Sequence, residues 1–291
     1  RQVSDLTRAI EQLKSEMNES IVQFKRQQIE EKSNAKNCED MLLFIDTPAL
    51  RNGVDFLLIS ENNQTIELKN REWNSYNFGV FLVGEHITLT VNCSRKSKRE
   101  ELGHLKIKTS HLWIKQSSSK IDCSQLGHPR DSGSGKGGYG ASDTVCGGGG
   151  YGTKGEGEKG GDVCGEDTLL KEIHFGSGGG GWFGGGDGGG IIELVIGQQL
   201  TNHGSIQANG GNGCDRGGGG GSGGSILIEL QCQSKSDSIT LGQSFGTITC
   251  IGGNQHQINA GGKGRIAIYG FELSSDDIKN IDPKPFNRIY K

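Results

Sequence analysis

The chain has 291 residues, of which 51 are glycine, while only 32% are hydrophobic and 6% aromatic. Its formal net charge is −3, so the chain has no overall positive field that would attract nucleic acid or an anionic membrane surface. No apolar run reaches the roughly 18–20 residues that a membrane-spanning helix needs. We therefore expect the chain neither to bind nucleic acid nor to span a membrane. The low content of hydrophobic residues predicts a thin core built from small repeated layers.

Residues 1–45 predict a helix, because they contain no Gly and no Pro and are rich in charged residues. The apolar residues are spaced alternately by three and four, at Val3, Leu6, Ile10, Leu13 and Met17. This spacing is the heptad seam of a coiled coil, and a helix lying on its own domain is the alternative. We expect a coiled-coil oligomerisation helix through which the chain self-associates.

From residue 46 the apolar pattern changes to a period of two, which is typical of β-strands. Successive strands are predicted at "VDFLLIS", "TIELKN", "FGVFLVG", "HITLTVN", "HLKIKTS" and "HLWIKQ". Residues 46–104 are interpreted as a β-strand region that leads into a glycine-rich β-repeat domain at residues 105–291.

An internal repeat is visible in the segments "SKIDCSQLG", "GSIQANGG" and "GTITCIGG", which begin at Ser119, Gly204 and Gly246. Each has a strand before it and a glycine run after it, and such periods indicate stacked supersecondary units. The position after the repeated isoleucine is occupied by Cys123, Ala208 and Cys250, where we expect buried structural residues rather than reactive thiols. The predicted fold class is mainly β: a helical coiled coil followed by a stacked-strand domain, β-solenoid or β-sandwich-like, with ordered polyglycine segments.

The glycine run "GSGGGGWFGGGDGGG", residues 176–190, is followed by the strand "IIELVIG". A dinucleotide-binding loop would be followed by a helix, so a phosphate site is not expected. Glycine segments without Cβ atoms pack side by side as extended rods, and one ordered rod is predicted here. The acidic loop at residues 156–167 lacks the tandem pattern of calcium-binding repeats, and neither metal nor cofactor is assigned.

Four aromatic residues stand inside the glycine-rich loops and are the candidate ligand contacts: Tyr139, Tyr151, Trp182 and Phe183. An exposed ring in such a loop can contact a protein or glycan ligand. A ring that covers a glycine rod as a lid is the favoured interpretation, and a ligand contact is the alternative. The order of an oligomerisation helix and a β-repeat domain predicts a non-catalytic structural, adhesive or protein-binding module, displayed as an oligomer.

A carbohydrate-active β-solenoid enzyme is the alternative function. Such chemistry needs two carboxylates about 5–10 Å apart. Asp122, Glu193 and Glu229 lie on predicted strands that could align across layers, or could simply face water. No catalytic residue is assigned.

The ordered motifs "IDCSQLGHPRDSGSGKGGYG", "GGGGGSGGSILIEL" and "GGKGRIAIYG" resemble the glycine-rich β-repeat regions of large uncharacterised bacterial, plant and protist proteins. The resemblance covers residues 105–269. More distantly, this region resembles the glycine-rich domain of the lymphoma kinase receptors, which implies glycine rods inserted in a β-sandwich that binds protein ligands.

The N-terminal segment resembles the coiled coil of tripartite-motif proteins, which implies the substrate-binding region of a ubiquitin ligase whose catalytic part is missing. The eight cysteines form no CxxC pair, so a zinc ribbon is not expected. No signal-peptide pattern is present, but the chain begins at Arg1 and not at Met, so this absence says little about the compartment. A cytoplasmic protein is slightly favoured over a secreted one, and the compartment stays open.

Overall fold

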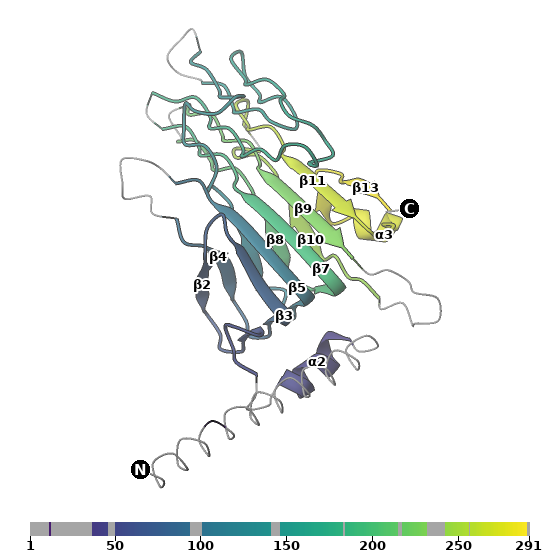
Figure 1. Ribbon diagram of the computed structural model, residues 1–291. Helices are drawn as coiled ribbons and strands as arrows, with labels where there is room; N and C mark the ends of the chain where they lie inside the picture. Colours follow the sequence, from purple (N-terminus) through teal and green to yellow (C-terminus); the bar gives the residue numbers. More distant parts are fainter. Residues whose placement is uncertain are drawn as a thin grey trace, which may run out of the picture.

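The computed structural model describes Gln12 and residues 37–45, 50–93, 101–140, 146–182, 184–214, 217–231, 242–255 and 257–289. Within these residues the chain is mainly β and forms two parallel sheets (Figure 1). The seven-stranded sheet contains, in spatial order, β1 (Leu57–Ile59), β3 (Trp73–Leu82), β5 (His104–Ile114), β7 (Ile191–Asn202), β9 (Ser225–Leu230), β11 (Arg265–Tyr269) and β13 (Phe286–Arg288). The six-stranded sheet contains β12 (Ile281–Asp282), β10 (Thr247–Thr249), β8 (Ser205–Gln207), β6 (Lys120–Asp122), β4 (Thr88–Val91) and β2 (Thr65–Leu68).

Successive strands alternate between the two sheets, so each pair of strands adds one layer to the stack. The layers are in register, and the isoleucines of the internal repeat become neighbours. Ile121 pairs with Ile206, and Ile206 pairs with Ile248. All three are fully buried in the core between the sheets. Each buried aliphatic side chain of this kind stabilises the fold by about 1.5–3 kcal/mol. Residues on both sides of position 104 contribute strands to the same two sheets.

The predicted core ladder at Cys123, Ala208 and Cys250 is confirmed, because each residue has an exposed fraction of 0%. Their backbone N–H groups donate to Gln207, Thr249 and Asp282, which extends the ladder one residue beyond each short strand. Burial raises the pKa values of the Cys123 and Cys250 thiols well above the ordinary value. Both side chains are therefore structural and poorly reactive.

The glycine-rich loops connect the six-stranded sheet to the seven-stranded sheet and form a packed array of extended rods beyond the strands (Figure 1). Each rod has hydrogen-bonded neighbours on more than one side. Gly221, for example, donates its N–H to Gly211 over 2.9 Å and accepts from Gly253 over 2.8 Å. This mutual bonding satisfies backbone groups that would otherwise be buried without partners.

The predicted single rod at residues 176–190 is two antiparallel rods in the structure. Gly176 donates its N–H to Gly189, and Gly179 donates to Gly186, both over 2.9 Å. The chain reverses around Trp182 and Gly184, and Gly184 has a φ of +135° that side-chain-bearing residues rarely adopt. A uniform glycine run carries no sign of where it turns back, so the sequence did not reveal this reversal.

The predicted N-terminal coiled coil is wrong for the residues that the structure describes, and the predicted fold class is corrected accordingly to two parallel β-sheets with two short helices. Self-association through the N-terminal segment stays a prediction. Most of residues 1–36 lie outside those residues. The helix α2 (Cys38–Ile45) buries Met41 and Ile45 against Phe81 and Trp113 on the outer face of the seven-stranded sheet. Its apolar side is thus covered within its own chain rather than by a second helix. The other helix, α3 (Ser275–Ile278), is a single turn.

In the described part of the chain, none of the helices combines the length and apolar character that crossing a membrane requires.

Candidate functional site

Two of the four aromatic candidates form an exposed pair, which we call the aromatic tip. The rings of Tyr139 and Trp182 lie 4.7 Å apart between centroids and are tilted by 44°. Their exposed fractions are 42% and 61%. Trp182 stands where two rods reverse, and Tyr139 follows the neighbouring rod, in which Gly137 donates its N–H to Gly178 over 3.0 Å. Rods that are distant in sequence therefore bring the two rings together.

Polar groups border the aromatic tip. Asp131 accepts the N–H of Gly181 at Oδ1 over 3.1 Å, which fixes its carboxylate beside Trp182. The Tyr139 hydroxyl hydrogen-bonds to Asp131, and this bond together with the negative charge raises the pKa of Tyr139, while the exposed Arg130 acts in the opposite direction. The tip thus offers two rings, a carboxylate and a guanidinium to one ligand.

The other two candidates differ from this pair. Tyr151 has an exposed fraction of 0%, and its hydroxyl lies 2.8 Å from Oγ of Ser225. The guanidinium of Arg265 lies 5.3 Å from the centre of its ring. Tyr151 is a core residue that ties a glycine rod to the sheet and presents no surface to a ligand. Phe183 lies outside the described residues.

A second polar region lies on the outer face of β3, β5 and β7, which we call the open face. On the neighbouring strands β9 and β11 the outer face is covered, because Leu169 packs on Leu227, Ala267 and Tyr269. On the open face, Trp73, Lys106 and Glu193 occur side by side in register. Lys106 lies 4.9 Å from the centre of the Trp73 ring and 3.3 Å from Oε1 of Glu193. His104 contacts the same carboxylate oxygen through Nε2.

The three carboxylates proposed for glycoside chemistry do not come together. Glu193 and Glu229 share the outer face of the seven-stranded sheet, offset because Glu193 pairs with Leu227 and Glu229 with Val195. Asp122 lies on the six-stranded sheet, where Lys120 contacts it over 2.6 Å. The buried core separates this sheet from the other two carboxylates.

Glu193 and Glu229 have pKa values shifted in opposite directions. Burial alone would raise the pKa of Glu193, but the hydrogen bonds and charges of His104 and Lys106 outweigh it and lower the pKa. Burial, followed by the negative charge of Glu193, raises the pKa of Glu229. Glu193 is therefore held as an ionised partner of two basic residues, which is a structural role.

These shifts predict opposite effects of two charge-removing substitutions. The low pKa of Glu193 means that its ionised form stabilises the fold above the pKa of the unfolded chain, and this contribution disappears as pH falls through the folded value. The raised pKa of Glu229 means that its ionisation costs stability as pH rises through the folded value. At pH 7, Glu193→Gln should lose about 1.5–3 kcal/mol, as expected for hydrogen bonds to charged groups, whereas Glu229→Gln should gain stability.

Urea unfolding at a series of pH values from 7 downward checks this prediction, because each difference from the wild-type chain should shrink as its carboxylate is protonated, that of Glu229→Gln at a higher pH than that of Glu193→Gln. A destabilised Glu229→Gln variant at pH 7, or an effect of Glu193→Gln that disappears at a higher pH than that of Glu229→Gln, would contradict the assigned charges.

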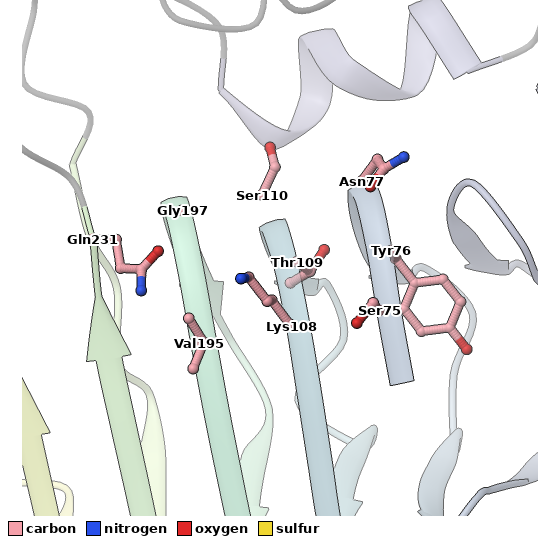
Figure 2. A pocket seen from close by; sticks show the side chains of 9 residues that line it. All are labelled: Ser75, Tyr76, Asn77, Lys108, Thr109, Ser110, Val195, Gly197 and Gln231. Atoms are coloured by element: carbon pink, nitrogen blue, oxygen red, sulfur yellow. The ribbon is translucent and has the colours of Figure 1, made fainter. Parts of the chain in front are cut away.

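A cavity of about 390 Å³ opens on the outer face of the same sheet. Figure 2 shows the residues that line it: Ser75, Tyr76, Asn77, Lys108, Thr109, Ser110, Val195, Gly197 and Gln231. The registers of β3 with β5 and of β5 with β7 shift at this level, between Tyr76 and Gly79 and between Thr109 and His111. Sequence analysis missed this site because it interpreted the shift after Thr109 as a break between two strands.

No cluster of three or more His, Cys, Asp or Glu side chains suited to a metal ion occurs among the described residues. Comparison of the chain with known protein families, with curated proteins and with solved structures finds no match. The resemblances drawn from the glycine motifs therefore stay predictions, and function has to be argued from the geometry.

Proposed function

We propose that the chain is a non-catalytic adhesive module that binds a glycan through the aromatic tip. The observation that carries this proposal is the exposed, stacked pair of Tyr139 and Trp182 beside the carboxylate of Asp131. A sugar has apolar C–H faces that stack on aromatic rings and hydroxyl groups that hydrogen-bond to carboxylates and guanidinium groups. The tip supplies both kinds of contact within one small surface.

The glycine rods support the proposal by fixing the two rings before a ligand arrives. Gly178, Gly180 and Gly181 each donate a backbone N–H to a neighbouring segment, so the backbone that carries Trp182 is held on several sides. A preorganised site loses less conformational entropy on binding. A glycan suits the tip better than a protein surface, since a stable protein interface covers about 800 Å² per partner.

The test is a glycan array with the whole chain, followed by titration calorimetry with the glycans that bind. Trp182→Ala and Tyr139→Ala should each weaken binding by about tenfold or more, as expected for an aromatic anchor. Both rings are exposed, so the thermal unfolding midpoint should change little.

Trp73→Ala is the matched control, because Trp73 is also an exposed tryptophan, 44%, but belongs to the open face. It should leave glycan affinity unchanged. Absence of any bound glycan, or equal losses in Trp73→Ala and Trp182→Ala, would refute the proposed function. Turnover of a bound glycan that is lost in Glu229→Gln would instead favour the enzyme alternative.

A further inference from the structure

The cavity on the open face is lined mainly by polar side chains and contains one charged residue. Lys108 is the single charged residue among those that line it. Lys106, one side-chain row away on the same strand, is paired with Glu193 over 3.3 Å. Among the described residues, no carboxylate or carbonyl oxygen contacts the ammonium group of Lys108. Within the described part of the chain, the cavity therefore holds a positive charge at its edge that no protein group neutralises.

Neutral polar side chains surround this charge. Ser75 and Asn77 come from β3, and Gln231 directly follows β9. Within the described residues, none of these three side chains makes a hydrogen bond to the protein. Figure 2 shows the ends of Lys108 and Gln231 extending toward each other above β7. Their donors thus converge on the same space.

The floor of that space is apolar and flat. Val195 provides a small aliphatic surface, and Gly197 provides none beyond its backbone. A Cβ at Gly197 would make only ordinary contacts, at 3.5 Å from Cα of Ser110 and 3.7 Å from the carbonyl oxygen of Thr109, so steric packing does not require glycine there. The absent side chain leaves room above β7 for the ring of a small ligand.

We infer that this cavity binds an acidic sugar, with its carboxylate on Lys108. One cation suits one carboxylate, whereas a phosphate dianion is held by several cations or backbone N–H groups. The amides of Asn77 and Gln231 and the hydroxyl of Ser75 suit the ring hydroxyls, and the floor at Val195 and Gly197 suits the face of the ring. The volume of about 390 Å³ lies within the range of small-molecule sites. This site is separate from the aromatic tip.

The test is titration of the whole chain with sodium glucuronate, glucose and inorganic phosphate, followed by calorimetry or by NMR of the protein. Glucuronate should bind at least about tenfold more tightly than glucose or phosphate, because a charge-assisted contact adds to the hydroxyl contacts. Lys108→Gln should weaken glucuronate binding about tenfold or more. Lys136→Gln, which removes an exposed lysine from the glycine-rich region, should have no effect.

Two substitutions at the floor test the location independently of charge. Gly197→Leu should fill the cavity and abolish glucuronate binding, while Gly197→Ala should retain it within about twofold, because its Cβ makes only ordinary contacts. Trp182→Ala should leave glucuronate binding intact, which separates this site from the aromatic tip and from the proposed function.

Equal binding of glucose and glucuronate, equal binding in Lys108→Gln and wild type, or absence of glucuronate binding would overturn the inference. Phosphate binding that depends on Lys108 and exceeds glucuronate binding would overturn the assignment to an acidic sugar.

Discussion

Gly221→Ala is expected to unfold the protein or to lower its free energy of unfolding by at least about 4 kcal/mol. A Cβ at Gly221 would lie 2.1 Å from the backbone oxygen of Asp187 and 2.4 Å from its carbonyl carbon. Overpacking against side chains costs about 1–3 kcal/mol, because side chains can rotate away. Here a backbone would have to move, and it is held by its neighbours in the rod array.

The movement would also break hydrogen bonds. Gly221 bonds to Gly211 and Gly253 in two neighbouring rods, so displacement of one rod disturbs two more. The direction of the expected change is informative. Where the backbone allows it, replacing glycine by alanine normally stabilises a protein by about 0.4–1 kcal/mol, because it lowers the conformational entropy of the unfolded chain. A large loss therefore reports the packing of rods and not a general effect of alanine.

Gly242→Ala is the control for this experiment. A Cβ at Gly242 would meet no atom of the described residues within 4 Å, and its backbone is outside the left-handed region. This variant should be neutral or slightly more stable than the wild-type chain in urea or guanidinium unfolding. Similar losses in Gly221→Ala and Gly242→Ala would mean that the rods do not pack as the structure describes.

The sequence could predict the strands of the sheets, because both the strand periodicity and the internal repeat are patterns of apolar side chains. The repeated isoleucines Ile121, Ile206 and Ile248 pair across the layers because each repeat places them at the same point. Strand limits were less clear: "HLKIKTS" and "HLWIKQ" form the single strand β5, which carries a shift in register between Thr109 and His111.

The helical prediction failed for a physical reason. An apolar stripe shows that a helix needs a covering surface but does not show what covers it. In α2 the covering surface is formed by Phe78, Phe81 and Trp113, which come from two strands of the sheet. The outward orientation of Phe78 and Trp113 follows the shifts in register after Tyr76 and after Thr109, whereas Phe81 keeps the outward alternation of Trp73 and Ser75.

The candidate site could be predicted only as a set of separate residues. Tyr139 and Trp182 meet because their rods are neighbours, and a glycine rod has no side chains that could specify which rod lies beside it. Lys108 and Gln231 are 123 positions apart and converge only through the strand order of the seven-stranded sheet. Contacts of this kind depend on the whole fold.

Two tyrosines in identical local sequences lie in different environments, and the free energy of unfolding of their variants can measure that difference. Tyr139 and Tyr151 both occur in the tetrapeptide Gly-Gly-Tyr-Gly, yet their exposed fractions are 42% and 0%. Tyr151→Ala should lower the free energy of unfolding by about 3–5 kcal/mol, because it opens a cavity of aromatic size in the core. Tyr139→Ala should change it by no more than about 0.5 kcal/mol, because its ring faces solvent.

Tyr151→Phe separates the two contributions of the buried ring. It keeps the packing and the contact of the ring with Arg265, and it loses only the hydrogen bond to Ser225. Ser225 still donates its hydroxyl to the carbonyl oxygen of His174 over 2.6 Å, so the loss should stay near 0.5–1.5 kcal/mol, roughly that of one hydrogen bond. Denaturant unfolding of the three variants should therefore rank Tyr151→Ala far below Tyr151→Phe, with Tyr139→Ala near the wild type. Equal effects of the two alanine variants would place both rings in the same environment and would remove the distinction between a core tyrosine and a ligand-binding one.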